Sequence, residues 1–297
     1  MNYAIRYDSK FRHFKDVNEI VFYYNVNFDS LMYQIESAVK NENQKVIIDA
    51  GFLELDNSFD IEGLVKIRDK YKNFLIQLPW GDSEKLDLVK KANLPYMFSD
   101  YAKTREMVYA MYKAGAKEIY VVEELCFNLP ALQFFRKECG IKLRIFPDVA
   151  QIETNSQKYV NPLTKFFVRP EDVSLYEEYV DTFEIFHFGE KISVIYEIYK
   201  QEQWLGNLNQ IIMGLKCDIV NTSIAPHFGK CRLNCNKMCY INKCFICPEI
   251  EKLAYAFDDA GLEIIKKRKT FSDNLTQEEK EEMLKTIEKD NNELTTN

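Results

Sequence analysis

Short apolar runs alternate with amphipathic helical patterns along most of the first two thirds of the chain. The runs are rich in β-branched and aromatic residues. Eight of them are strand candidates: Glu19–Tyr24, Lys45–Ala50, Phe74–Leu78, Tyr96–Ser99, Glu118–Val122, Leu143–Phe146, Lys165–Val168 and Phe183–Phe188. Continuous apolar runs of this length are typical of strands buried on both faces, as in a parallel sheet. Near the amino terminus Tyr3, Ile5 and Tyr7 alternate with polar or small residues, which is compatible with a short edge strand.

Helical patterns occupy the segments between these runs. They cover Asp29–Lys40, Ile61–Tyr71, Ser83–Ala92, Thr104–Ala114, Leu129–Glu138, Pro170–Tyr179 and Ser193–Lys200. We expect Asp29 or Ser30 to cap the first helix and Ser83 to cap the third, because short polar side chains accept hydrogen bonds from the first helical amides. Gly115 and Gly140 follow two of the helices as natural C-terminal caps.

Strand and helix alternating in this way predict a (β/α)8 barrel. A doubly wound open sheet is the alternative, but it usually carries a glycine-rich phosphate-binding turn after its first strand. The corresponding segment here, 23–30 (YYNVNFDS), contains no glycine, and the chain has neither a GxGxxG nor a P-loop pattern. We expect the barrel to span residues 1–225, a cysteine-rich metal-binding module 226–256, and a helical tail with a disordered end 257–297.

In a barrel of this kind, chemistry takes place where the strands end and the following loops begin. Five polar residues that follow strand candidates within a residue or two are selected as candidate catalytic residues: Asp49, Glu123, Asp148, Arg169 and His187. Each can titrate or bind charge, although each alone is also explained by the chain leaving the core. Together they predict a polar mouth that binds a small polar molecule. A structural alternative is that Arg169 pairs with Asp148 or Glu123 inside the barrel.

Five of the eight cysteines fall within 17 residues: Cys231, Cys235, Cys239, Cys244 and Cys247. The chain shows no secretory signal and no apolar run long enough to span a membrane, so we expect a cytoplasmic protein with reduced thiols. Clustered cysteines in that setting indicate metal or catalysis rather than disulfides. Cys126 and Cys139 stand apart, and core packing is the simpler explanation for both.

The spacing inside this cluster indicates a soft metal site. The last two cysteines form a CxxC knuckle, and Pro248 follows them as it often follows the last ligand of an iron–sulfur loop. The first three are spaced by four, which places them on one stripe of a helix. We expect an iron–sulfur cluster, with zinc as the alternative and a run of free or redox-active thiols as the third explanation. Cys217 or His227 could also contribute a ligand.

Charge limits the classes of partner. The formal net charge is −7 and the isoelectric point is near 5.3. A surface of that charge argues against generic binding to nucleic acid or to anionic membranes. We therefore expect a small polar substrate or an RNA base, and no membrane partner.

Residues 167–189, which read FVRPEDVSLYEEYVDTFEIFHFG, resemble the collagenase-like peptidase family, family U thirty-two. The resemblance implies a barrel strand that delivers a glutamate and a His-Gly pair to the mouth, and these map onto Glu184, His187 and Gly189. Members assigned to oxygen-independent hydroxylation hold an iron–sulfur cluster through nearby cysteines. In this chain Phe188 separates the histidine from the glycine, and the clustered cysteines lie about forty residues later.

Three functions are compatible with these features. The first is an iron–sulfur-dependent barrel enzyme that acts on a small molecule, a cofactor precursor or an RNA base by hydroxylation or related redox chemistry. The alternative is a non-catalytic binding or assembly protein stapled by zinc. A peptidase is the third, although the chain has no HExxH zinc-binding pattern.

Overall fold

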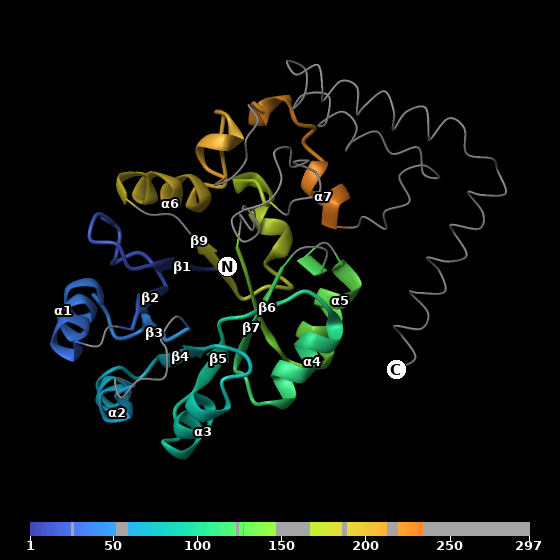
Figure 1. Cartoon of the computed structure of the whole chain (residues 1–297). Helices are drawn as coiled ribbons and strands as arrows, with labels where there is room; N and C mark the ends of the chain where they lie inside the picture. The colour runs from blue at the N-terminus through green and yellow to red at the C-terminus, as the bar shows by residue number, and fades with distance from the viewer. Residues whose placement is uncertain are drawn as a thin grey trace, which may run out of the picture.

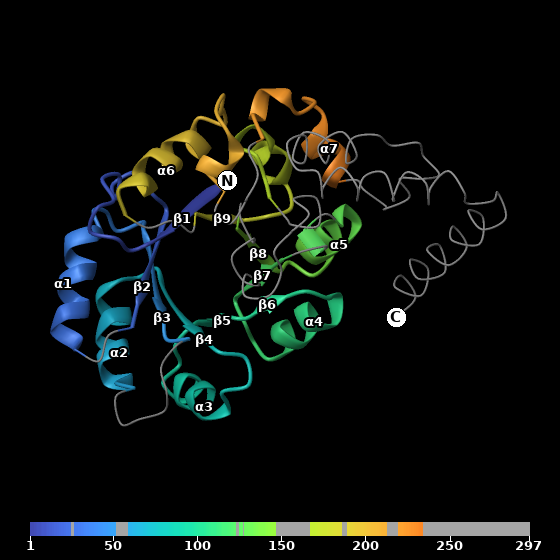
Figure 2. The same ribbon diagram turned by 45° about the horizontal axis from the view of Figure 1, so that its top comes forward.

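The computed structural model describes residues 1–24, 27–51, 59–122, 125–126, 128–146, 167–185, 189–212 and 219–233. In this part of the chain a nine-stranded parallel sheet occupies the centre, and helices surround it (Figures 1 and 2). The strands are β1 (Asn2–Arg6), β2 (Glu19–Tyr23), β3 (Lys45–Asp49), β4 (Phe74–Leu78), β5 (Tyr96–Phe98), β6 (Tyr101–Ala102), β7 (Glu118–Val121), β8 (Lys142–Ile145) and β9 (Thr182–Ile185).

The sheet curls into a nearly closed barrel. Its strand order is β5-β4-β3-β2-β1-β9-β8-β7-β6, and every pair is parallel. The two end strands, β5 and β6, are separated in the chain only by Ser99 and Asp100, and β5 also lies against β7. Counted as one bent strand, β5 and β6 give eight strands that follow the chain order around the barrel. The predicted α/β barrel is therefore confirmed at the level of its strands.

One strand assignment changes. β1 pairs with both β2 and β9, so it lies inside the sheet and not at an edge. Seven of the eight predicted runs coincide with β2 to β5 and β7 to β9. The eighth, Lys165–Val168, is described only from Phe167, and Phe167 and Val168 belong to none of the nine strands. The alternation of Tyr3, Ile5 and Tyr7 is typical of an edge strand, but here it arises because the intervening Arg6 faces the barrel interior and pairs with buried carboxylates there.

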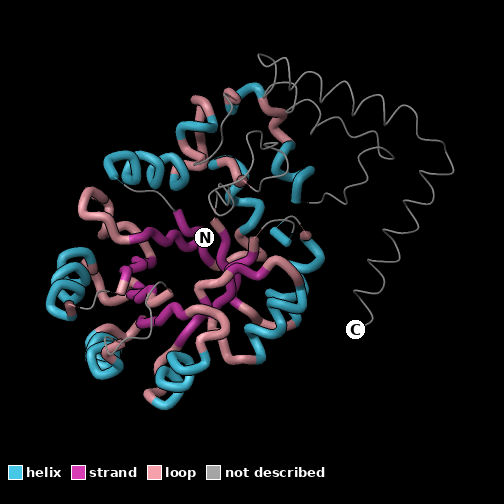
Figure 3. Tube along the Cα trace, viewed as in Figure 1, coloured by secondary structure: helices cyan, strands magenta, loops and turns pink. Residues whose placement is uncertain are grey.

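Helical segments lie outside the ring of strands (Figure 3). They are α1 (Phe28–Ala38), α2 (Ile61–Lys70), α3 (Ser83–Lys91), α4 (Arg105–Lys113), α5 (Leu129–Gln133), the π-helix η2 (Phe134–Glu138), the 3-10 helices η3 (Pro170–Tyr176), η4 (Gly189–Lys191), η5 (Leu208–Gln210) and η6 (Asn221–Ser223), and the α-helices α6 (Ile192–Lys200) and α7 (Phe228–Leu233). Between β1 and β2 the chain forms turns and no helix.

The helix caps differ in part from the predicted ones. Asn27 caps α1 by accepting a hydrogen bond from the Ser30 amide at 3.0 Å, and Asp82 caps α3 through the Lys85 amide at 3.0 Å. The predicted caps at the start of α1 and at Ser83 are wrong because those residues already lie inside the helices. Gly115 and Gly140 follow their helices with φ of 100° and 65°, the left-handed conformation that favours glycine, as predicted.

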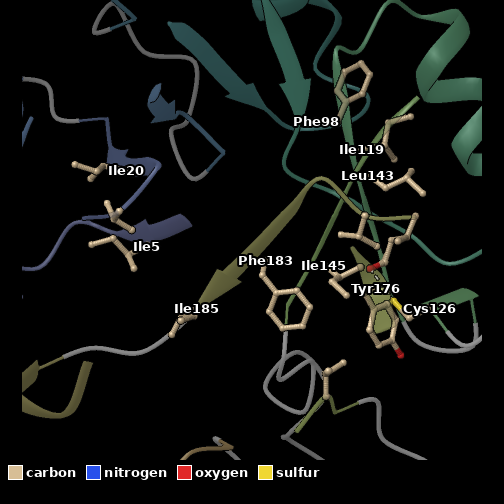
Figure 4. Close-up of a cluster of buried hydrophobic side chains, with 14 of the residues drawn as sticks. Ile5, Ile20, Phe98, Ile119, Cys126, Leu143, Ile145, Tyr176, Phe183 and Ile185 are labelled. Carbon is tan, nitrogen blue, oxygen red and sulfur yellow. Dashed lines mark hydrogen bonds between the residues drawn. The ribbon is translucent and has the colours of Figure 1, made fainter. Parts of the chain in front are cut away.

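Alternation along the strands divides the core into two layers. The outward residues pack under the helices, and Figure 4 shows several of them, among them Ile5, Ile20 and Phe183. Cys126 is fully buried in this outer layer, where its thiol donates to the Val121 carbonyl at 3.1 Å, so the core role predicted for it is confirmed. The inner layer fills the barrel with six apolar side chains: Val21, Ile47, Leu75, Met97, Tyr120 and Phe146.

Past the barrel, α7 packs on η3. The rings of Phe167 and Phe228 stack at 5.5 Å. The expected boundary between the barrel and the cysteine module, at 225–226, falls just before α7. Residues 234–297 lie outside the described part of the chain, so the cysteine module and the helical tail stay predictions. No helix of the described residues is both long and apolar enough to cross a membrane.

Candidate functional site

The barrel interior contains charged side chains as well as apolar ones. Residues two apart on a strand share a face. In the described ranges the inner face carries seven charged residues: Arg6, Glu19, Lys45, Asp49, Glu118, Arg144 and Glu184. Lys45 has a side-chain exposure of 22%, and the other six are at 5% or less. Charges removed from water to this extent persist only when they are paired, and these seven form one continuous network.

The network begins at the amino ends of the strands. Glu19, Lys45 and Glu118 are the first residues of β2, β3 and β7. Lys45 Nζ lies 3.0 Å from a Glu19 oxygen and 2.5 Å from a Glu118 oxygen, and Arg144 pairs with the same two carboxylates. Burial would raise the pKa of Glu19, but Arg144 and Lys45 outweigh burial and lower the pKa to about 2. At this end of the barrel, two basic and two acidic side chains therefore pair with one another.

Glu184 carries the network through the middle of the barrel. Its carboxylate is fully buried and lies 3.2 Å from Arg144 Nη2 and 3.1 Å from Arg6 Nε. The Tyr120 hydroxyl donates a hydrogen bond to the same carboxylate. Burial, reinforced by the charge of Glu184, raises the pKa of Tyr120 well above its usual value, so this phenol stays protonated. Glu184 thereby fixes the position of Arg6.

Arg6 brings the network to the carboxyl ends of the strands. Its Nη1 donates to Asp49 Oδ2 at 2.5 Å, and its guanidinium lies 5.3 Å from the centre of the Tyr23 ring. Asp49 Oδ1 accepts a second hydrogen bond from the Gly51 amide at 2.9 Å. Arg6 and Asp49 are the last residues of β1 and β3. Their charges are therefore held at the end of the barrel where parallel α/β barrels bind ligands.

Three adjacent strands bring side chains to this end in one register. Tyr23 pairs with Asp49 across β2 and β3, and Asp49 pairs with Gln77 across β3 and β4. We call Tyr23, Asp49 and Gln77 the mouth row. Neighbouring strands lie about 4.8 Å apart, so these side chains stand next to one another on the inner face.

The members of the mouth row differ in exposure and in partners. Tyr23 is 38% exposed, whereas Gln77 is 1% exposed. Among the described residues, the Gln77 side-chain oxygen is buried without a hydrogen-bond partner. A buried polar atom of this kind is uncommon and costs free energy, so its retention requires an explanation.

Tyr101 lies close to the same charges from β6. Its ring contacts those of Tyr120 and Phe146 edge-on. Burial first, and then the negative charge of Glu184, raises the pKa of Tyr101 to about 12. The Tyr101 phenol is therefore neutral at physiological pH, and can act as a hydrogen-bond donor or acceptor but not as a charge.

The structure places two of the five predicted catalytic residues. Asp49 is part of the interior network, as described above. Arg169 is at the start of η3, where it forms a bidentate ion pair with Asp172. Its Nε donates to Oδ2 at 2.6 Å and its Nη2 to Oδ1 at 3.0 Å, and its guanidinium lies 5.2 Å from the centre of the Phe228 ring. No contact between described residues joins Arg169 to Asp49. Glu123, Asp148 and His187 lie outside the described residues, so their expected roles, and the alternative pairing of Arg169 with the first two, stay predictions.

The residues implied by the family resemblance divide in the same way. Glu184 is the buried centre of the network. Gly189 begins η4 with φ of 75°, and its amide donates to Asp8 at 2.6 Å. His187 lies outside the described residues.

Sequence reasoning missed most of the network. Arg6, Glu19, Glu118 and Arg144 were not selected, because they lie inside the predicted strands or at their beginnings. A signal was nevertheless present, since three strands begin with or contain a charge on the inward-facing alternation: EIVFY, KVIID and EIYV. A charge at the same position of several buried strands indicates partners inside the barrel.

The proposed metal ligands are described only at their beginning. Cys231 is half-buried in α7, while Cys235, Cys239, Cys244 and Cys247 lie outside the described residues. Within the described ranges, no group of three His, Cys, Asp or Glu side chains could hold a metal ion. The choice of four ligands among these five cysteines therefore stays a prediction.

Comparison with known proteins adds no family. The chain matches no protein-family profile and no curated protein. Among solved structures it is similar to a designed cube-shaped, porous protein cage, at 14% identity over 96% of this chain and 98% of the other, with a TM-score of 0.39. It is also similar to a structure titled native KDPGal, at 11% identity over 67% and 94%, with a TM-score of 0.40. A third is the carboxyl transferase domain of pyruvate carboxylase from Rhizobium etli, at 10% identity over 62% and 39%, with a TM-score of 0.36. Because these scores are low, the fold assignment rests on the strand order of this chain itself.

Proposed function

We propose that this protein is a barrel enzyme that binds a small polar substrate over the mouth row, at the carboxyl ends of β2, β3 and β4. The observation that carries the proposal is the buried ion network that ends at Asp49. A barrel needs no charges to fill its interior, and apolar residues of similar volume usually stabilise a core at least as well. Here Glu184 and Arg6 instead hold one carboxylate in a fixed orientation at the end of the barrel where chemistry takes place.

The network suits a binding or proton-transfer role for Asp49. Each of its oxygens accepts one hydrogen bond, Oδ2 from Arg6 and Oδ1 from the Gly51 amide. A carboxylate oxygen can accept two hydrogen bonds, so each has room for one more. A substrate donor can therefore approach Asp49 without displacing either partner. Groups positioned in advance lower the cost of organising a reaction, because the protein has already arranged their dipoles and charges.

An RNA base is the second substrate class under this proposal. An unstacked base presents N–H donors that could bind Asp49 as those of a small polar molecule would. The acidic net charge favours a small molecule, because phosphate contacts need a basic surface. A direct comparison separates the two: a library of small polar metabolites and a set of short single-stranded RNAs are screened against the protein by ligand-observed NMR. Binding by RNA alone would move the substrate class to nucleic acid.

Asp49→Asn provides the decisive variant in that screen. It keeps the shape of the side chain and removes its charge, so metabolites that bind wild type are expected to lose most of their signal. Glu36→Gln is the matched control, because Glu36 is 52% exposed on α1 and pairs with Lys70 on α2, away from the mouth row. Equal binding by wild type and Asp49→Asn would contradict the proposal.

The family resemblance and the cysteine spacing extend the proposal to iron–sulfur-dependent chemistry of the hydroxylation type. An iron–sulfur cluster bound by four of the five clustered cysteines would supply electron transfer. The test is metal content and the visible absorption spectrum of protein purified without oxygen. We expect about four irons per chain and a brown colour that bleaches in air, both lost when Cys235, Cys239, Cys244 and Cys247 are replaced by alanine. One zinc in a colourless protein would instead indicate a structural site.

A further inference from the structure

We propose that the mouth row binds its ligand through a protonated nitrogen, such as the ammonium group of a primary amine. This inference rests on the proposed function, because it names the chemical class that the same site takes. Asp49 and Gln77 supply the acceptor oxygens. Tyr23 supplies an aromatic ring beside them, and that ring already interacts with one cation, the Arg6 guanidinium.

The charge balance inside the barrel favours a cation. Three basic side chains face four carboxylates within the described part of the chain, which leaves a formal excess of one negative charge. The imbalance is located near the mouth. At the amino ends Lys45 and Arg144 pair with Glu19 and Glu118. Arg144 also lies 3.2 Å from Glu184, whereas Arg6 is the one cation of this seven-residue network that pairs with Asp49. A bound ammonium group next to Asp49 would restore neutrality where charges interact strongly.

Gln77 is the independent observation that indicates a ligand. It is 1% exposed, it faces the interior in register with Asp49, and its side-chain oxygen has no hydrogen-bond partner in the part of the chain that the structure describes. An acceptor left unpaired beside a carboxylate needs a donor, and an anion would bring only further acceptors. An ammonium group has three N–H donors, so it can satisfy Gln77 and Asp49 at the same time.

The alternatives fit less well. An anionic ligand would need Arg6, but the Nη1 atom of that guanidinium already donates to Asp49, and its Nε atom lies 3.1 Å from a Glu184 carboxylate oxygen, which would repel an anion. A magnesium or calcium ion prefers six or more oxygen ligands, and the mouth row offers one carboxylate and one amide. Nitrogen cations have no such requirement, and aromatic rings add to their binding.

Two series of matched probes test the charge preference. The first is benzylammonium, benzyl alcohol and benzoate, and the second is ethylammonium, ethanol and acetate. Each series keeps a similar size and changes the charge from positive to neutral to negative. Affinities are measured by ligand-observed NMR and, where heat is detectable, by calorimetry on the full chain. We expect the ammonium member of at least one series to bind about tenfold more tightly than its neutral partner, because charge-assisted hydrogen bonds are the stronger ones.

Gln77→Leu and Asp49→Asn locate the binding. Gln77→Leu removes the unpaired oxygen without breaking a hydrogen bond between described residues, so the variant is expected to fold. It should weaken ammonium binding by about tenfold or more, the effect of losing one hydrogen bond to a charged group. Asp49→Asn should weaken it further, and Glu36→Gln should leave it unchanged.

Each other outcome overturns the inference in a distinguishable way. Tighter binding of benzoate or acetate, lost in Asp49→Asn, would keep the mouth row as the ligand site and reject the nitrogen cation. Ammonium binding that neither variant changes would place the cation elsewhere. If no probe binds while metabolites still bind wild type and not Asp49→Asn, the proposed function stands and the protonated nitrogen is rejected.

Discussion

Gln77 lies next to Asp49 in the same register of the barrel, and both side chains are buried. Both Asp49 oxygens accept hydrogen bonds, whereas the Gln77 oxygen accepts none from any residue that the structure describes. Folding therefore leaves an acceptor unsatisfied at the end of the barrel where ligands bind. Such a group reduces stability in the absence of a ligand and is useful only if a ligand satisfies it.

This relationship predicts that Gln77→Leu stabilises the ligand-free protein. Replacing an unpaired buried amide by an apolar side chain of similar size removes a desolvation cost, so the free energy of unfolding should rise by about 1 kcal/mol. Urea denaturation followed by circular dichroism measures the change.

A second buried glutamine provides the matched control for that measurement. Gln44 is 3% exposed, accepts from the Lys40 and Asn41 amides at 2.6 and 3.1 Å, and donates to the Val17 carbonyl at 2.9 Å. Gln44→Leu should lower the free energy of unfolding by about 2 to 4 kcal/mol, because it leaves these backbone groups without partners. If Gln77→Leu also lowered the free energy of unfolding, the Gln77 oxygen would have a hydrogen-bond partner in solution.

Arg144 is predicted to be the residue on which the interior network depends most. It is fully buried and pairs with three carboxylates, and these raise its pKa well above the usual value although burial acts against them. Arg144→Met should lower the free energy of unfolding by about 3 to 5 kcal/mol at neutral pH, because buried carboxylates lose their main partner. The loss should shrink as the pH falls and those carboxylates take up protons. Arg136→Met is the control, since Arg136 is 37% exposed and pairs with Asp181 at the surface. Equal effects of the two changes would contradict a special role for Arg144.

The lowered pKa of Glu19 predicts how the free energy of unfolding depends on pH. Its pKa is lowered from 4.5 to about 2 in the folded protein, so the unfolded chain binds a proton at a higher pH than the folded one. The stabilisation from Glu19 is therefore complete above about pH 5 and is lost as the pH falls towards 2, by about 3 kcal/mol in total. Urea denaturation at stepped pH should show a steep decline in wild type over this window. Glu19→Gln should be less stable at neutral pH and should show a shallower decline. If the free energy of unfolding fell equally steeply with pH in wild type and in Glu19→Gln, another carboxylate would control the loss of stability at low pH.

Arg169 is predicted to have a structural effect through Asp172. Their two-pronged ion pair is buried under α7, where a Cβ added at Gly229 would lie 2.2 Å from the Asp172 carboxyl carbon. Arg169→Ala and Asp172→Ala should each destabilise by about 3 kcal/mol, and the double variant should cost about 2 kcal/mol less than their sum. Thermal unfolding of the four proteins in this cycle measures the coupling. Simple additivity would show that the pair contributes nothing and would leave Arg169 available for the catalytic role first expected for it.

The sequence predicted the strands better than the site. Runs such as Lys45–Asp49 are apolar on both faces, because Ile47 fills the barrel and Ile48 packs under the helices. That double burial is a local property and can be recognised from the sequence. The pairing of Arg144 with Glu19 joins residues 125 positions apart, and no spacing rule connects them. Asp49 is a candidate because it ends a strand, which is a local signal, whereas Gln77 lies inside the apolar run Phe74–Leu78, and no local signal shows that its oxygen is unpaired.

The most direct test of the central claim is the methionine methyl NMR spectrum of the protein during titration with metabolites that bind it. Met97 pairs with Gln77 in the barrel and is fully buried in the inner layer, whereas Met32 and Met107 lie on the outer helices α1 and α4. If the substrate binds over the mouth row, the Met97 methyl resonance should shift with the ligand concentration, and the other two should stay in place. A shift at Met32 or Met107 with none at Met97 would place the ligand outside the barrel and contradict the account.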